Sequence, residues 1–243
     1  MVRDNEWFTE WFNSPFYHIL YKHRDENEAQ TFINRLESFL NFSKGMKVLD
    51  LGCGRGRHAV YLCQKGLNVT GIDIAQENIR YAKKFSSDTL NFRVHDMRDE
   101  LWDGGYDVIL NLFTSFGYFL SEEEDLKVLN NVYSALKTGG KFVIDFMNVD
   151  KIVGRLVTKQ TITVEGIEFN ITRTFIDGFI IKDINFVVNE KEYHFQEKVK
   201  AITHQKFLEY FSTTGFKVLN VFGNYQLDEF AQESERMIYV VEK

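Results

Sequence analysis

Apolar residues near the start of the chain recur at the spacing of an α-helix. Trp7 and Trp11 lie one turn apart, each followed by a phenylalanine, and residues 32–40 carry a second apolar face of period 3.6. Ser14 followed by Pro15 is typical of an N-cap with proline at the first helical position. We therefore predict that the first 43 residues form a helical cap.

From Lys47 onward, short apolar runs alternate with helix-like segments. The runs typical of buried strands are 47–51, 68–72, 91–94, 106–112 and 141–146. The helix-like segments between them are 56–65, 75–85 and 122–136, and we expect the last to end at Thr138-Gly139-Gly140. This alternation predicts an α/β fold with a doubly wound parallel sheet and right-handed crossovers.

The alternation stops near Asp150, where β-rich runs begin. Runs dominated by Thr, Val, Ile and Phe cover residues 161–165, 167–176, 179–188 and 193–202. Asp177-Gly178 between two of them indicates a hairpin. A helix over 204–213, capped by Thr203 and ended by Gly215, and strands 216–222 and 237–241 follow. We therefore predict one domain made of residues 1–149 and 203–243, with residues 150–202 inserted as a small antiparallel sheet.

Composition narrows the classes of protein that the chain can represent. The 243 residues carry 29 basic and 35 acidic side chains, a formal charge of −6, and 44% are hydrophobic, which is enough for a packed core. The acidic balance disfavours nucleic-acid binding, because phosphate neutralisation needs clustered basic residues. No apolar run is long enough for a membrane span, and the first residues do not resemble a signal peptide. Cys53 and Cys63 form no disulfide framework, so we expect a cytoplasmic protein.

Metal binding has no support in the sequence. The six histidines are scattered, and neither Cys-x-x-Cys nor His-Glu-x-x-His occurs. We therefore expect no metal site.

The strand at residues 47–51 leads into a glycine loop, Gly52-Cys53-Gly54-Arg55-Gly56. Glycines there permit positive φ and a close approach of ligand to backbone, at the sheet edge where open α/β folds bind ligands. Asp73 ends the next strand, where a carboxylate can accept both hydroxyls of a ribose. The pattern therefore predicts an adenosine-bearing ligand.

Two details favour S-adenosylmethionine (SAM) over a dinucleotide. The glycines follow G-x-G-x-G spacing, whereas the dinucleotide fingerprint is G-x-G-x-x-G. Asp50 places an anion where a pyrophosphate would lie. That carboxylate suits SAM, which carries an ammonium and a sulfonium and no phosphate.

Over nearly its whole length the chain resembles the class I SAM-dependent methyltransferases. The resemblance rests on five segments in order: Asp50-Leu51-Gly52-Cys53-Gly54-Arg55-Gly56, Gly71-Ile72-Asp73-Ile74, Val94-His95-Asp96-Met97, Tyr106-Asp107-Val108-Ile109 and Gly139-Gly140-Lys141-Phe142. It implies a seven-stranded Rossmann-like sheet whose last strand is antiparallel, and an insertion that resembles the lid of some small-molecule methyltransferases.

The resemblance also implies which residues hold SAM. Asp73 would bind the ribose, Ile74 would pack on the adenine, and Asp96 with Met97 would contact the adenine edge. The methionine part would lie over the glycine loop beside Asp50. The backbone of Asn111, Leu112 and Phe113 would close the site. In relatives an N-terminal helix covers SAM and can hold its carboxylate, a role open here to Tyr17, Tyr21 and Arg24.

The reaction so implied is transfer of the sulfonium methyl group to an N, O or C nucleophile of a small molecule, leaving S-adenosylhomocysteine. Catalysis then depends mainly on positioning and on exclusion of water. An acceptor that must lose a proton needs a base, for which the candidates are His18, Tyr118 and His194. The segment after residue 110 reads Asn-Leu-Phe-Thr and lacks the Asn-Pro-Pro-Tyr motif of methyltransferases acting on adenine or glutamine.

Several alternatives stay open at this stage. A nicotinamide-dependent oxidoreductase is disfavoured by the glycine spacing and Asp50, and a non-catalytic SAM-binding protein is compatible with every motif. Arg55, Arg57 and His58 begin a helix and can face either ligand or solvent. The sequence does not select the acceptor, the base, or a monomer over a homodimer.

Overall fold

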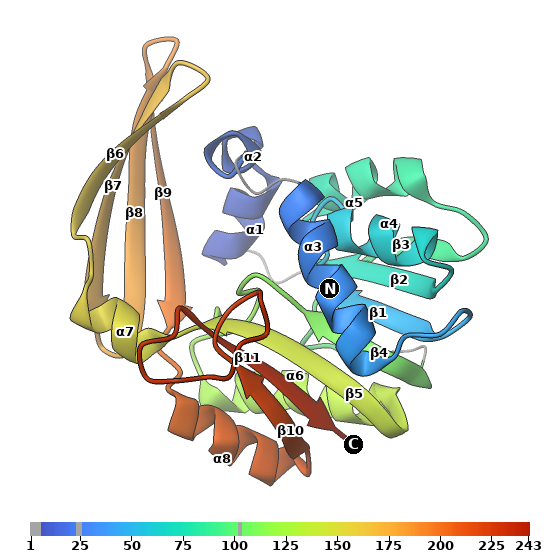
Figure 1. Cartoon of the computed structure of the whole chain (residues 1–243). Helices are drawn as coiled ribbons and strands as arrows, with labels where there is room; N and C mark the ends of the chain where they lie inside the picture. The colour runs from blue at the N-terminus through green and yellow to red at the C-terminus, as the bar shows by residue number, and fades with distance from the viewer. Residues whose placement is uncertain (1–5, 23–25, 102–103) are drawn as a thin grey trace.

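The computed structural model describes residues 6–22, 26–101 and 104–243, and its centre is a seven-stranded sheet (Figure 1). The strands are β1 (Lys47–Leu51), β2 (Asn68–Asp73), β3 (Leu90–Val94), β4 (Tyr106–Asn111), β5 (Leu136–Met147), β10 (Lys217–Phe222) and β11 (Arg236–Glu242). Their order is β10-β11-β5-β4-β1-β2-β3, and β11 alone runs antiparallel to both of its neighbours. The predicted doubly wound sheet with an antiparallel last strand is confirmed.

Helices cover both faces of this sheet because its strands are apolar on both sides. One face packs on α3 (Glu26–Leu40), α4 (Arg57–Gln64) and α5 (Gln76–Ala82), which the short 3₁₀ turn η1 (Lys83–Phe85) extends. The other face packs on α6 (Glu122–Ala135) and α8 (His204–Thr214). Successive residues of each strand serve opposite cores, as Val48 and Leu49 do in β1.

The predicted end of α6 at Gly139-Gly140 is wrong. The helix ends at Ala135, and Leu136 already pairs with Tyr106 as the first residue of β5. Gly139 has φ +75°, and the register between β4 and β5 shifts across this stretch. The glycines therefore form an irregularity inside a long strand, because sheet pairing begins before the glycine signal is reached.

A second, four-stranded antiparallel sheet stands beside the first (Figure 1). It consists of β6 (Lys159–Val164), β7 (Ile167–Ile176), β8 (Phe179–Val188) and β9 (Lys191–Lys200), and α7 (Val149–Gly154), which was not predicted, leads into it. Asp177 and Gly178 both have positive φ, as the predicted hairpin turn requires. The predicted β-rich insertion thus forms a separate antiparallel sheet of its own.

The N-terminal helices α1 (Trp7–Asn13) and α2 (Pro15–Leu20) lie against the second sheet. Trp11 is fully buried there, and its ring centroid is 4.6 Å from that of Phe195. Ser14 Oγ accepts a hydrogen bond from the backbone N–H of Phe16, which confirms the predicted cap. No helix within the described residues is long and apolar enough to cross a membrane.

A buried arginine joins three separate parts of the chain. Arg98, in the loop after β3, has no exposed surface and donates from Nε to Asp96 Oδ1 at 3.0 Å. Its Nη1 donates to Glu6 Oε1 at 2.7 Å and to Glu124 Oε1 at 2.9 Å. One guanidinium therefore ties the start of α1 and the first turn of α6 to the edge of the large sheet.

We expect Arg98→Ala to lower the free energy of unfolding by about 3–5 kcal/mol, because it leaves the buried Asp96 carboxylate, and the partly exposed carboxylates of Glu6 and Glu124, without their cation. Arg80→Ala is the control, since Arg80 forms an exposed pair with Glu77 worth about 0–1 kcal/mol. Urea denaturation followed by circular dichroism measures both. Equal losses for the two variants would show that the Arg98 cluster does not hold the three segments together.

Candidate functional site

A cavity of about 470 Å³ lies at the carboxyl ends of the strands of the large sheet. Its walls come from the loops after β1, β2 and β4, from α1 and α2, and from Glu197 and Val199 of β9. A smaller pocket of about 50 Å³ adjoins it and is lined by Ile74, Asp96 and Met97, among others. The two spaces share five lining residues: Phe12, Gly52, Asp73, Ser115 and Tyr118.

The glycine loop forms the floor of the larger cavity in a shape that side chains would prevent. Gly52 has φ +79°, and a Cβ atom there would lie 2.7 Å from Ser115 Cβ. At Gly56, with φ +87°, a Cβ would lie 2.7 Å from the ring of Phe92. Glycine is therefore required at both positions, for backbone conformation and for space.

Asp73 is held rigidly where the two spaces meet. Its Oδ2 accepts from the backbone N–H of Gly54 at 2.8 Å, and its Oδ1 accepts from that of Ala75 at 2.8 Å. Burial raises the pKa of Asp73, while these hydrogen bonds act in the opposite direction. Each carboxylate oxygen can accept a second hydrogen bond, so Asp73 suits a ligand with two adjacent hydroxyls.

Asp50 presents an unsatisfied charge to the same cavity. It is 1% exposed, and no described residue donates a hydrogen bond to its Oδ2. Burial, and then the charge of Asp73, raises the pKa of Asp50 from 3.8 to about 7. A buried carboxylate oxygen without a donor suits a cationic group of a ligand, and an alkylammonium has the matching chemistry.

Comparisons with known proteins agree with this geometry. A family model described as a methyltransferase domain matches residues 48–140. YqeM of Bacillus subtilis (strain 168), a methyltransferase by name, is 27% identical over 208 residues, which cover 81% of this chain and 84% of that protein. The glycine/sarcosine/dimethylglycine N-methyltransferase of Actinopolyspora halophila is 27% identical over 236 residues, or 93% of this chain, but the match covers only 40% of that longer protein.

A solved structure shares the fold along almost the whole chain. The SAM-dependent methyltransferase of Clostridium acetobutylicum ATCC 824 superposes with a TM-score of 0.81 at 22% identity, covering 93% of this chain and 96% of that one. Residues 48–140 thus match a methyltransferase domain, and the chain shares the fold of a SAM-dependent methyltransferase along almost its whole length. The resemblance predicted from the five sequence segments is confirmed.

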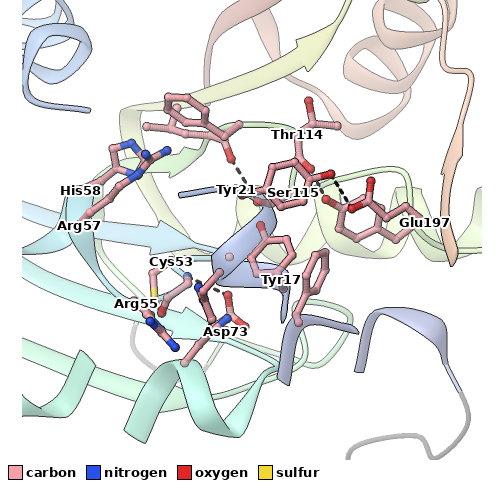
Figure 2. Close-up of a pocket in the computed structure, with 18 of the residues that line it drawn as sticks. Tyr17, Tyr21, Cys53, Arg55, Arg57, His58, Asp73, Thr114, Ser115 and Glu197 are labelled. Atoms are coloured by element: carbon pink, nitrogen blue, oxygen red, sulfur yellow. Dashed lines mark hydrogen bonds between the residues drawn. The ribbon is translucent and has the colours of Figure 1, made fainter. Parts of the chain in front are cut away.

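Cationic and aromatic side chains form one end of the methyltransferase's cavity. The Arg57 guanidinium lies 4.4 Å from the centroid of the Phe113 ring, on which His58 also stacks. Burial and the nearby Arg57 lower the pKa of His58 to about 3, so its imidazole is neutral, and no described residue hydrogen-bonds to its Nε2. Figure 2 shows Arg57 and His58 at the opposite end of the view from Glu197. This end offers donors suited to an anionic group.

Glu197 of β9 is the acidic group at the other end. Its Oε1 accepts from Trp11 Nε1 at 2.8 Å and from the Tyr21 hydroxyl at 2.6 Å, and its Oε2 lies 3.4 Å from Lys182 Nζ. The carboxylate thus joins α1, α2 and the second sheet beside the cavity. The alternating pattern of β9 does not distinguish Glu197 from an ordinary surface residue, so Glu197 was not predicted as a site residue.

The loop after β4 lies between these two ends in a constrained conformation. Phe113 and Thr114 both have φ +58°, which is uncommon for residues with side chains. Buried Asp145, near the end of β5, accepts from the N–H of Phe113 at 2.8 Å and from Arg236 Nε at 2.7 Å. Arg236 Nη2 in turn donates to Thr114 Oγ1 at 2.8 Å. Asp145 and Arg236 therefore hold a loop that lines the cavity. Neither residue was predicted from the sequence.

Most of the predicted SAM-binding residues line one of the two spaces. The larger cavity has Tyr17, Tyr21, Asp50, Gly52, Gly54, Asp73, Leu112 and Phe113, and the smaller pocket has Gly52, Asp73, Ile74, Asp96 and Met97. Both carboxylate oxygens of Asp96 already bind Arg98. Gly56 and Asn111 lie behind the walls, where the Asn111 side chain donates to the Leu51 carbonyl at 2.8 Å. Arg24 lies outside the described residues.

The three candidate bases have different surroundings. His18 lines the larger cavity, where its Nε2 hydrogen-bonds with Asn78 Oδ1 at 2.8 Å, and burial together with Arg55 lowers its pKa to about 4. Tyr118 lines both spaces and donates to the Thr114 carbonyl. His194 is not at the cavity: its side chain is 59% exposed and hydrogen-bonds with Asn185. It lies an odd number of residues from Glu197 on β9 and so faces the other side of the sheet.

No group of three or more potential metal ligands occurs among the residues that the structure describes.

The raised pKa of Asp50 predicts a pH dependence of stability in the ligand-free protein. Between pH 3.8 and about 7 the folded state holds a proton on Asp50 that the unfolded state has lost. The free energy of unfolding should therefore fall as pH rises through this window, by on the order of 4 kcal/mol from this group, and then level off. Asp50→Asn should remove that part of the slope, as measured by urea denaturation at successive pH values.

Asp88→Asn, a change of the same kind in an exposed turn, serves as the control and should leave the slope as in wild type. An Asp50→Asn protein with the full wild-type slope would mean that Asp50 does not titrate in this window.

Proposed function

We propose that this methyltransferase moves the methyl group of SAM to an amine nitrogen of a small polar molecule. The observation that carries the proposal is the Glu197 carboxylate, which lines an otherwise largely aromatic part of the cavity. Trp7, Phe12, Tyr17 and Tyr118 supply the aromatic rings there. Aromatic faces together with a carboxylate favour ammonium and methylammonium groups over neutral hydroxyls.

The cofactor half of the site follows from the two adjoining spaces. Adenine would occupy the smaller pocket between Ile74 and Met97, and Asp73 would accept the ribose hydroxyls where the spaces meet. The methionine part would then run over Gly52 and Gly54 into the larger cavity. Its ammonium would satisfy the orphaned Asp50 Oδ2, which the structure otherwise leaves buried without a donor.

Two groups of donors are available for the methionine carboxylate. Arg57 and His58 begin α4 directly after the glycine loop and line the larger cavity. Tyr17 and Tyr21 approach from α2, as the resemblance implied. We assign the carboxylate to the Arg57 end, because Tyr21 already donates to Glu197.

An ammonium acceptor must first release one proton to water as it enters the cavity. Its lone pair can then attack the methyl group of the SAM sulfonium as the C–S bond breaks and S-adenosylhomocysteine leaves, so the protein needs to position that lone pair and exclude water. The walls support both tasks. α1 and α2 cover the cavity from one side, and β9 contributes Glu197 and Val199 from another. We propose on this basis that the β6–β9 sheet serves as the cover of the acceptor.

The small volume of the cavity supports a small acceptor, because both the methionine part of SAM and the acceptor must share about 470 Å³. The amine is further supported by the Actinopolyspora halophila relative, whose name specifies N-methylation of glycine, sarcosine and dimethylglycine.

The cofactor assignment predicts that Asp73→Ala weakens SAM binding by about 10- to 150-fold, since it removes a charged acceptor of two hydroxyl hydrogen bonds. Isothermal titration calorimetry measures the Kd, and circular dichroism checks the fold because Asp73 also binds the Ala75 N–H. Asp73→Asn keeps the shape without the charge and should show a smaller loss. Wild-type affinity in a folded Asp73→Ala protein would refute this assignment.

The amine assignment predicts transfer of label from methyl-labelled SAM to small primary and secondary amines, and not to matched alcohols or thiols. Mass spectrometry of the products identifies the methylated atom. Glu197→Gln should reduce kcat/KM for amines by at least about tenfold while leaving the Kd of SAM near wild type. Label found only on oxygen or carbon acceptors would contradict the proposal.

A further inference from the structure

Arg236 is a further charged group that lines the cavity. It begins β11, opposite Met147 of β5, and both residues line the cavity. In the order β11-β5-β4-β1-β2, the strand that carries Arg236 is three strands from β1 and four from β2. At about 4.8 Å per strand, β11 lies roughly 14 Å from the strand that leads into the glycine loop. The strand that carries Arg236 is therefore well separated from the strands that end near Asp50 and Asp73.

The guanidinium of Arg236 is fixed in place from behind. Nε and Nη2 both approach Asp145 Oδ1 at 2.7 Å, and Nη2 also reaches Thr114 Oγ1. Asp145 is itself held by the Phe113 N–H and, at 3.1 Å, by the Tyr225 hydroxyl. The oxygens of Asp145 therefore already accept hydrogen bonds from protein donors. The Arg236 guanidinium cannot rotate without breaking several hydrogen bonds.

One edge of this guanidinium has no hydrogen-bond partner among the described residues. The structure gives Arg236 Nη1 no hydrogen bond to any described residue, although the side chain is 19% exposed and lines the cavity. The free N–H groups of Nη1 can donate a charge-assisted hydrogen bond to a carboxylate oxygen, and the fixed guanidinium supplies the positive charge beside it.

We infer that Arg236 binds a carboxylate of the methyl acceptor. This inference rests on the proposed function and names its substrate class, an amine that also carries a carboxylate. The acceptor's amine would lie toward Glu197 of β9 and its carboxylate toward Arg236 of β11. The two opposite charges of the cavity would then orient the acceptor and direct its nitrogen toward the methyl group.

A purely structural role for Arg236 makes a different prediction. If it only braces Thr114 and Asp145, its loss should impair every acceptor and the binding of SAM alike. If it recognises a carboxylate, the loss should depend on whether the acceptor has one. Paired acceptors that differ only at that group separate the two roles.

The experiment compares kcat/KM for glycine with glycinamide, and for sarcosine with sarcosinamide. Wild type should favour each acid over its amide. Arg236→Gln should lower kcat/KM for the acids about 100-fold more than for the amides, mainly through KM; a loss common to both acceptors measures the separate role of Arg236 in bracing Thr114 and Asp145. Arg236→Lys should recover part of the preference for acids over amides, because lysine restores the positive charge without the planar N–H donors of a guanidinium.

Arg57→Gln is the matched control, since Arg57 lines the same cavity beside the glycine loop. It should weaken SAM binding and leave the ratio between acid and amide as in wild type. An Arg236→Gln protein that loses kcat/KM for acids and amides by equal factors overturns the inference while amine methylation stands.

Binding tests the subsite even if no amine in the panel is methylated, a result that would count against the proposed function itself. Glycine and acetate are titrated into the protein loaded with S-adenosylhomocysteine and followed by NMR. Saturable binding of both in wild type, lost in Arg236→Gln, supports the carboxylate subsite. Equal binding by the two proteins, or no binding by either, overturns it.

Discussion

The site depends on one constraint, namely that carboxylates buried at the ends of parallel strands must find donors. Asp73 obtains them from the N–H groups of Gly54 and Ala75, and Asp145 from that of Phe113 and from Arg236. Each of these hydrogen bonds fixes a loop that lines the cavity. Asp50 Oδ2 has no donor among the described residues. This oxygen therefore suits a cationic group of a ligand. The shape and the charge of the cavity thus have a common origin.

The second constraint is closure of the cavity by segments far apart in the sequence. Trp11 and Tyr21 of the N-terminal helices meet Glu197 of β9 across more than half of the chain, while Arg98 attaches the start of α1 to the large sheet. The N-terminal helices are therefore held on both sides, by the large sheet and by the inserted one. Aromatic residues of these segments, such as Trp11, pack in a core between the N-terminal helices and the second sheet, while Phe8 joins the core of the large sheet.

The cofactor half of the site could be predicted because its residues are local in sequence. Asp50, Gly52 and Asp73 lie at the ends of adjacent strands, and strand–loop–helix patterns place such ends together. The acceptor half could not be predicted in the same way. Glu197 and Arg236 stand in ordinary strand patterns, and only the order of the strands brings β11 and the second sheet to one cavity. The misplaced end of α6 has a related cause, since pairing of Leu136 with Tyr106 overrides the local glycine signal.

By itself, the sequence determined the alternating α/β architecture, the hairpin-rich insertion and the type of cofactor, because hydrophobic period and glycine spacing are properties of neighbouring residues. Tertiary structure alone decided which charges face the acceptor. His194 and Glu197 are three residues apart on one strand, and only the pleat of β9 exposes one and directs the other into the cavity. Electrostatic environment was likewise decided by packing, since burial beside Asp73 raises the pKa of Asp50 to about 7, and burial beside Arg57 keeps His58 neutral.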